Sequence, residues 1–145
     1  MWSPLSWAAE KGHVDVVKLL LNANANIEAA GDDRRTPLSW AAENGHVDVV
    51  KLLLNANANI ETTDKSGQPP LSWAAENGHV DVVKLLLNAN ANIEAADSEY
   101  GRTPLSWASR NGHVDVVKLL LNANANIETA DKSRRTPLGW FKIAD

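Results

Sequence analysis

Apolar and polar residues follow a helical period in two short runs, residues 37–44 and 47–54. In the first run, Leu38, Ala41 and Ala42 fall at i, i+3 and i+4, which places small apolar side chains on one narrow helix face. In the second run the polar positions form one narrow stripe and the rest are Val and Leu. The pattern predicts two helices of about eight residues, and the second helix has to be covered from both sides.

The residues that flank these runs are typical helix starts and stops. Thr36 is a suitable N-cap, and Pro37 stands at the first helical position, where its missing N–H costs nothing. Gly45 is expected to end the first helix in the left-handed conformation, and Asn57 to turn the chain after the second. Helices this short do not persist alone in water, so stacking against neighbours has to hold them.

This two-helix segment recurs along the chain with few changes. The prolines that open the successive copies are 33, 33, 34 and 33 residues apart: Pro4, Pro37, Pro70, Pro104 and Pro137. We therefore divide the chain into copies one to four and a partial copy five: residues 3–35, 36–68, 69–102, 103–135 and 136–145. The chain is predicted to form one all-α solenoid with a single continuous core.

A period near 33 with a T-P-L start, an A-A step and a G-H turn resembles the ankyrin repeat. The amino-acid sequence of the copies is most similar to the ankyrin arrays of large fungal NOD-like receptor proteins. The resemblance implies stacked helix-turn-helix units, hairpin-like tips between copies, and a concave face that binds another macromolecule. Two departures stand out, because Ser39 replaces the usual histidine of T-P-L-H and Asn57 replaces the usual glycine.

Composition narrows the classes of function. The chain of 145 residues has no cysteine, so disulfides, thiolate metal sites and a cysteine nucleophile are excluded. A net charge of -4 argues against a general nucleic-acid binder. No signal-peptide pattern or membrane-length apolar run is present, so we expect a soluble, cytoplasmic protein. Charge is uneven, with residues 1–101 at -7 and residues 102–145 at +3.

Candidate chemistry is weak. Histidines one repeat apart are separated by roughly the 8–10 Å between packed helices, too far to share one zinc ion. We expect each to be structural, bonding backbone at a G-H turn. One tryptophan per copy is expected to fill the gap between stacked helices; an aromatic ladder for bases or sugars is the alternative. No phosphate-binding or hydrolase motif occurs. We therefore predict no enzyme, no metal and no cofactor.

The few differences among the copies indicate where a partner would bind. They gather at the tips and at the pair of residues that ends each first helix, which in ankyrin proteins line the concave face. Eight residues are the predicted contacts with a protein partner: Arg35, Glu43, Gln68, Glu76, Tyr100, Arg102, Arg110 and Arg135. Loops that vary freely without function are the alternative explanation.

The near-identity of the copies fits two origins. Either the repeats were recently duplicated, or the chain is an engineered or truncated scaffold with no natural ligand. The first copy lacks a polar capping repeat, and copy five stops after one helix. Exposed apolar ends are therefore expected to favour end-to-end association.

Overall fold

The computed structural model describes residues 2–144, with side chains from residue 2 to residue 140. Within these residues the chain forms nine α-helices and no β-strand. Five inner helices stand in one row: α1 (Pro4–Lys11), α3 (Pro37–Asn44), α5 (Pro70–Glu76), α7 (Pro104–Arg110) and α9 (Pro137–Ala144). Four outer helices form the second row: α2 (Val14–Asn22), α4 (Val47–Asn55), α6 (Val80–Asn88) and α8 (Val114–Asn122). The predicted all-α repeat solenoid is confirmed.

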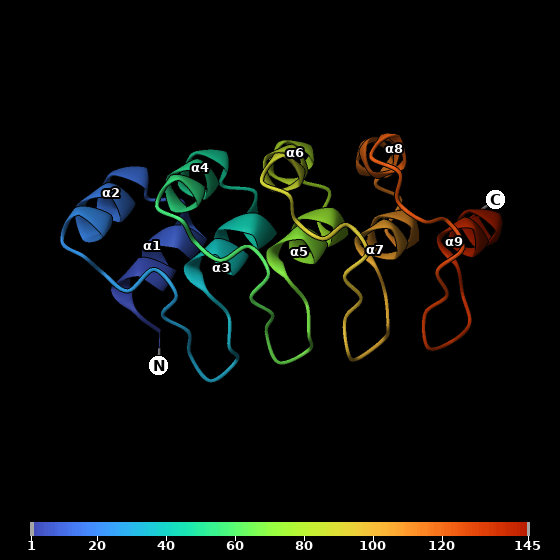
Figure 1. The fold of residues 1–145 in the computed structure, drawn as a ribbon, viewed down its shortest axis with the longest axis horizontal. Helices are drawn as coiled ribbons and strands as arrows, with labels where there is room; N and C mark the ends of the chain where they lie inside the picture. Colours follow the sequence, from blue (N-terminus) through green and yellow to red (C-terminus); the bar gives the residue numbers. More distant parts are fainter. Residues whose placement is uncertain (1, 145) are drawn as a thin grey trace.

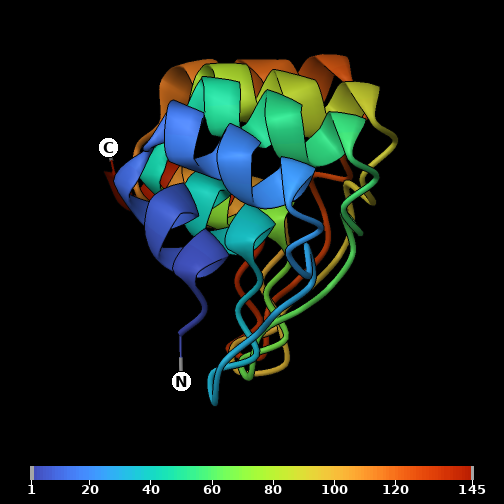
Figure 2. The ribbon, with the colours of Figure 1, turned by 90° about the vertical axis from the view of Figure 1, so that its left-hand side faces the viewer.

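Copies one to four each contribute one inner and one outer helix, the partial copy five contributes the inner helix α9, and both rows stack in chain order (Figure 1). Inner helices pack on the inner helices before and after them, and outer helices do the same. Viewed along the stack, the two rows form two layers, and the loops between copies extend away from the inner layer (Figure 2). We call these loops the tips; they comprise residues 31–35, 64–68, 97–102 and 131–135.

The predicted helix signals are confirmed. The hydroxyl of Thr36 accepts a hydrogen bond from the Ser39 N–H at 3.3 Å, and Pro37 begins the helix. Gly45 ends α3 with φ 72°. A side chain built at Gly45 would lie 2.5 Å from Nδ1 of His79 in the next copy, so this position needs glycine for both its conformation and the close approach. The turn after each outer helix has a positive φ at asparagine, as at Asn57 (64°).

The core consists of aliphatic ladders that run between the two layers. Leu38, Ala41 and Ala42 on α3 are fully buried with Val49 and Leu53 of α4, and the equivalent residues are buried in copies three and four. The small alanines let neighbouring inner helices come close. The outer helices are covered on both sides by their neighbours only in the middle of the stack, which is why Leu19 on α2 is 69% exposed.

Histidines fasten each copy to the one before it. The Nε2 atoms of three histidines lie 2.7–2.8 Å from carbonyl oxygens at the ends of the preceding inner helices: His46 on Glu10, His79 on Glu43 and His113 on Glu76. This confirms the structural role predicted for them. Glutamates form a second set of hydrogen bonds between copies. For example, the Asn59 N–H donates to Oε2 of Glu28 in the preceding copy at 2.7 Å.

The tips are held by backbone bonds along the stack. Three N–H groups donate to carbonyls of the preceding tip at 2.8–3.0 Å: Lys65 to Asp33, Ser98 to Ser66 and Lys132 to Tyr100. Arg34 and Arg134 hold positive φ values of 61° and 65°, where Gly67 and Gly101 stand in the other tips. Because a left-handed conformation is unfavourable for a residue with a side chain, these two tips carry backbone strain.

Candidate binding face

The tips and the ends of the inner helices share one side of the molecule, which we call the inner face. Glu10, Glu43, Glu76 and Arg110 occupy the same position at the ends of successive inner helices. The tips extend away from the inner layer (Figures 1 and 2). Contacts of Arg35 with Glu43 and of Gln68 with Glu76 join two tips to the ends of the inner helices that follow them.

At the base of the tips, tryptophans alternate with a second set of side chains. The tryptophans lie one per inner helix: Trp7, Trp40, Trp73, Trp107 and Trp140. The second set consists of the residues directly before each helix cap, which we call the slot residues: Trp2, Arg35, Gln68, Arg102 and Arg135. Trp2 lies between Trp7 and Trp40, with ring centroids 4.4 and 4.2 Å away. Together the two sets form a ladder along the inner face.

Arg35 shows how an arginine fills such a slot. Its guanidinium carbon lies 3.7 Å from the Trp40 ring centroid and 4.0 Å from that of Trp73, so an indole stacks on each side. Nη1 lies 2.8 Å from Oε1 of Glu43. Nε donates to the Ser39 hydroxyl at 3.3 Å. Stacking, charge and hydrogen bonding are thus all satisfied inside the protein.

Gln68 and Glu76 occupy the same two positions one copy later. Gln68 Nε2 lies 3.5 Å from Glu76 Oε2, which replaces the short ion pair of Arg35 and Glu43. Burial raises the pKa of Glu76 above its ordinary 4.5; Glu43 and Asp97 add to the rise, while the Gln68 hydrogen bond and Arg110 oppose it. Glu76 is therefore a carboxylate without a guanidinium partner in its own copy.

Buried aspartates hold two of the indoles in place. The Trp73 N–H donates to Oδ2 of Asp64 at 2.9 Å, and the Trp107 N–H donates to Oδ2 of Asp97 at 2.9 Å. The other oxygen of Asp97 accepts the N–H groups of Tyr100 and Gly101, so one carboxylate fixes both a tip and an inner-face ring. The indole orientation is therefore set by the tips.

The prediction that the tryptophans fill the gap between stacked helices is confirmed for Trp107, which is only 6% exposed, and is wrong for Trp7, which is 51% exposed. None of the tryptophans belongs to the main cluster of aliphatic side chains. They lie at the rim of the core, where the tips meet the inner helices. The predicted indole partner is present for Trp73 and Trp107.

Near α7 and α9 the ladder includes exposed side chains. Arg102 lies 4.5 Å from the Tyr100 ring and 4.8 Å from the Trp107 ring, and its Nε is 3.5 Å from Oδ2 of Asp131. Tyr100 itself is 44% exposed and meets Trp107 edge to face, with centroids 5.9 Å apart. Exposed aromatic and arginine side chains are the types that most often anchor protein interfaces.

These observations can be set beside known families. A family profile described as Ankyrin repeats (3 copies) matches residues 1–64 and 56–131. The chain belongs to the ankyrin-repeat family. No curated protein matches the chain. Ankyrin repeats generally serve as protein–protein interaction modules, and the family is typically non-catalytic.

The structure divides the eight predicted contact residues of this ankyrin-repeat chain into two groups. Arg35 and Gln68 are 7% and 4% exposed, so their side chains belong mainly to the scaffold. The side chain of Arg102 is 11% exposed. Burial argues against these three residues as direct contacts, because each is a slot residue between inner helices. The other five reach the inner surface: Glu43, Glu76, Tyr100, Arg110 and Arg135.

Sequence reasoning missed the slot itself. The residue before each cap varies among Trp, Arg and Gln, which makes it resemble a free tip position. A signal was nevertheless present, because these residues keep the period of the tryptophans, at Trp2, Arg35, Gln68, Arg102 and Arg135.

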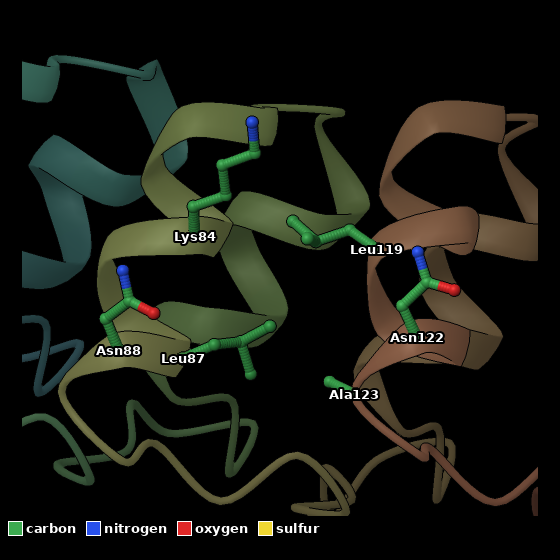
Figure 3. A pocket seen from close by; sticks show the side chains of 6 residues that line it. All are labelled: Lys84, Leu87, Asn88, Leu119, Asn122 and Ala123. Carbon is green, nitrogen blue, oxygen red and sulfur yellow. The ribbon is translucent and has the colours of Figure 1, made fainter.

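Other parts of the ankyrin surface show no comparable arrangement. Among the described residues, no three His, Cys, Asp or Glu side chains are grouped to hold a metal ion. No helix within residues 2–144 is both long and apolar enough to cross a bilayer. A shallow groove separates the outer helices α6 and α8, lined by Lys84, Leu87, Asn88, Leu119, Asn122 and Ala123 (Figure 3). It is a packing groove between two outer helices, without converging charges.

Proposed function

We propose that this protein is a non-catalytic interaction module that binds a protein partner through its inner face, the concave face of the ankyrin family. The observation that carries the proposal is the difference between scaffold and variable positions. The side chains of Arg35 and Gln68 and of three histidines bond within the chain, whereas Tyr100, Arg110 and Arg135 extend into solvent from the same face. Exposed side chains on a rigid, internally bonded support are well suited to binding, since little freedom is lost.

Five residues form the proposed contact set: Glu43, Glu76, Tyr100, Arg110 and Arg135. They combine an aromatic anchor with charges of both signs, which gives specificity for a partner of matching charge pattern. We also propose that the protein acts in the cytoplasm and that its partner is a protein and not a nucleic acid.

A peptide-display selection on the folded chain tests this proposal without assuming any partner chemistry. Binders that recognise the inner face should lose roughly tenfold or more in affinity with Tyr100→Ala combined with Arg110→Glu. Lys51→Glu on α4 serves as the control, because its side chain is exposed on the outer row. If the selected binders lose affinity with Lys51→Glu and not with the double variant, the face assignment is wrong.

An engineered or truncated scaffold without a natural ligand is the second candidate, favoured by the repetition of the copies. The outer helices α4 and α6 have identical sequences, VDVVKLLLN, as do α2 and α8. Such a scaffold would still yield selected binders, but affinity capture with the chain would recover no protein sensitive to the inner-face variant. A relation to fungal NOD-like receptor arrays would favour the interaction module over the scaffold, because it would imply a natural partner.

Self-association through the ends is a further proposal for the partner. Val16 and Leu19 on α2, and Val114 and Leu121 on α8, are exposed in this chain. Light scattering over a wide concentration range tests it: larger species that vanish with Leu19→Glu would support end-to-end contact, and a constant monomer mass of 15.7 kDa would oppose it.

A further inference from the structure

We propose that the part of the inner face formed by α7 and α9 binds an acidic segment of the partner, through Asp and Glu side chains that pair with Arg110 and Arg135 beside Trp140. This inference rests on the proposed function and adds the chemistry of the partner. We call the group of residues concerned the arginine cluster: Tyr100, Arg102, Arg110, Arg135 and Trp140.

Three arginines converge on one indole in this cluster. The guanidinium carbons lie near the Trp140 ring centroid: Arg135 at 4.6 Å, Arg102 at 5.4 Å and Arg110 at 5.6 Å. Cation–π attraction to the indole offsets part of the repulsion among the three charges. The residues come from two tips and from the end of α7, so the fold, and not one sequence segment, assembles the cluster.

Arg35 provides a comparison within the same protein, because its guanidinium is both stacked and ion-paired. There, one guanidinium has two indoles and a carboxylate oxygen at 2.8 Å. In the arginine cluster, the only ion pair among the described residues joins Arg102 to Asp131, at 3.5 Å. Arg110 and Arg135 have no carboxylate within 4.0 Å in the part of the chain that the structure describes. Two positive charges are thus held beside an aromatic ring without an ion-pair partner there.

Arg110 and Arg135 are also exposed and can reach a partner. Arg110 makes one long contact, with its Nη1 3.4 Å from Oδ1 of Asn111. A guanidinium held over an indole keeps its N–H edge free, and this edge matches a carboxylate in bidentate geometry. Tyr100 adds an exposed ring to the same cluster, beside Arg102.

The rest of the inner face favours a protein segment over a nucleic acid. The position of Arg110 is occupied by Glu10, Glu43 and Glu76 in the earlier copies, so the face is acidic over most of its length and basic at one end. A long polyanion lying along the face would meet those glutamates, whereas a short acidic segment can occupy the basic end alone. The charge gradient also fixes the direction in which a partner of mixed charge would lie.

The other copies supply substitutions that this scaffold already accepts. Arg110→Glu restores the residue of copies one to three, and Arg135→Gln restores the slot residue Gln68. The matched control is Lys84→Glu with Lys118→Gln on the outer helices, which changes the net charge equally on exposed positions. Urea denaturation of each variant establishes that it is folded.

The test measures fluorescence anisotropy of a dye-labelled, glutamate-rich peptide, with a glutamine-for-glutamate peptide of the same length as reference. We expect binding of the acidic peptide only, a loss of roughly tenfold or more in affinity for Arg110→Glu with Arg135→Gln, and little change for the lysine control. Equal affinity of the double variant and the wild type would overturn the inference, as would tighter binding of labelled single-stranded DNA than of the peptide.

The outcome is separable from that of the proposed function. If display selection yields inner-face binders that lack acidic residues and ignore the arginine cluster, the interaction module stands and the acidic-segment inference fails. If no inner-face binder is found but the glutamate-rich peptide binds the cluster, the result limits binding to this end of the face.

Discussion

Two junctions between inner helices show opposite ways of using the same positions. Between α3 and α5, Arg35 is stacked on two indoles and paired with Glu43, and the Glu43 carbonyl accepts His79. Between α7 and α9, Arg102 shares one indole with two further arginines. At the first junction the charged side chains pair with each other and hold the copies together. At the second junction positive charge remains at the surface. Internal pairing and exposed charge therefore lie in different copies of one repeat.

The largest expected effect is the loss of the paired arginine. Arg35→Ala leaves the half-buried Glu43 without its ion pair and opens a gap between two indoles, so we expect about 3 kcal/mol of destabilisation in urea denaturation. Arg135→Ala near α9 should cost less than about 0.5 kcal/mol. Equal losses for the two variants would remove the distinction between the junctions.

Glycine at the inner-helix ends gives a second matched pair. Gly45→Ala requires a left-handed alanine and also overlaps the His79 ring, with 2.5 Å between the new carbon and Nδ1. At Gly112 the φ of 74° is similar, but a side-chain carbon built there would have no described atom within 4 Å beyond those of its chain neighbours. We expect a cost of about 1–2 kcal/mol at Gly112, and about 1–3 kcal/mol more at Gly45. Thermal unfolding of the two variants measures the difference; a larger loss at Gly112 would contradict the account.

A smaller effect concerns the slot in which Gln68 replaces arginine. Because the pKa of Glu76 is raised above the ordinary 4.5, its ionisation is less favourable in the folded chain than in the unfolded one. Stability is therefore lost as the pH rises from 4.5 through the folded pKa, and is regained as the pH falls. Glu76→Gln should be more stable than the wild type at neutral pH, and the difference should vanish below about pH 3.5.

Gln68→Arg sharpens the same point by building the Arg35–Glu43 pair into the next copy. The new guanidinium should lower the pKa of Glu76 and stabilise the fold by roughly 0.5–1 kcal/mol at neutral pH, but not in acid. Carbon-13 NMR of the Glu76 carboxyl and urea denaturation at both pH values provide the measurement. A stabilisation independent of pH would show that packing, and not charge pairing, separates the two slots.

Much of the architecture could be predicted from the sequence, because its causes are local. The cap at Thr36, the left-handed Gly45 and the turn at Asn57 depend on the conformational preferences of those residues themselves. The aliphatic stripe on each helix shows which side is buried, and the short helices require stacking. Histidine spacing alone excluded a shared metal.

The candidate site was predictable only in part, because its contacts join residues of different copies. Arg35 ends copy one but meets Trp40 of copy two and Trp73 of copy three, and only the stacking distance decides that both indoles sandwich one guanidinium. Periodicity cannot tell an exposed tip residue from one that folds back into a slot, so Arg35 and Gln68 looked like contacts. The sequence by itself determined the repeat, its helices and its turns. The tertiary stack decided which arginines are stacked and paired within the chain and which remain exposed, because those contacts join residues of different copies.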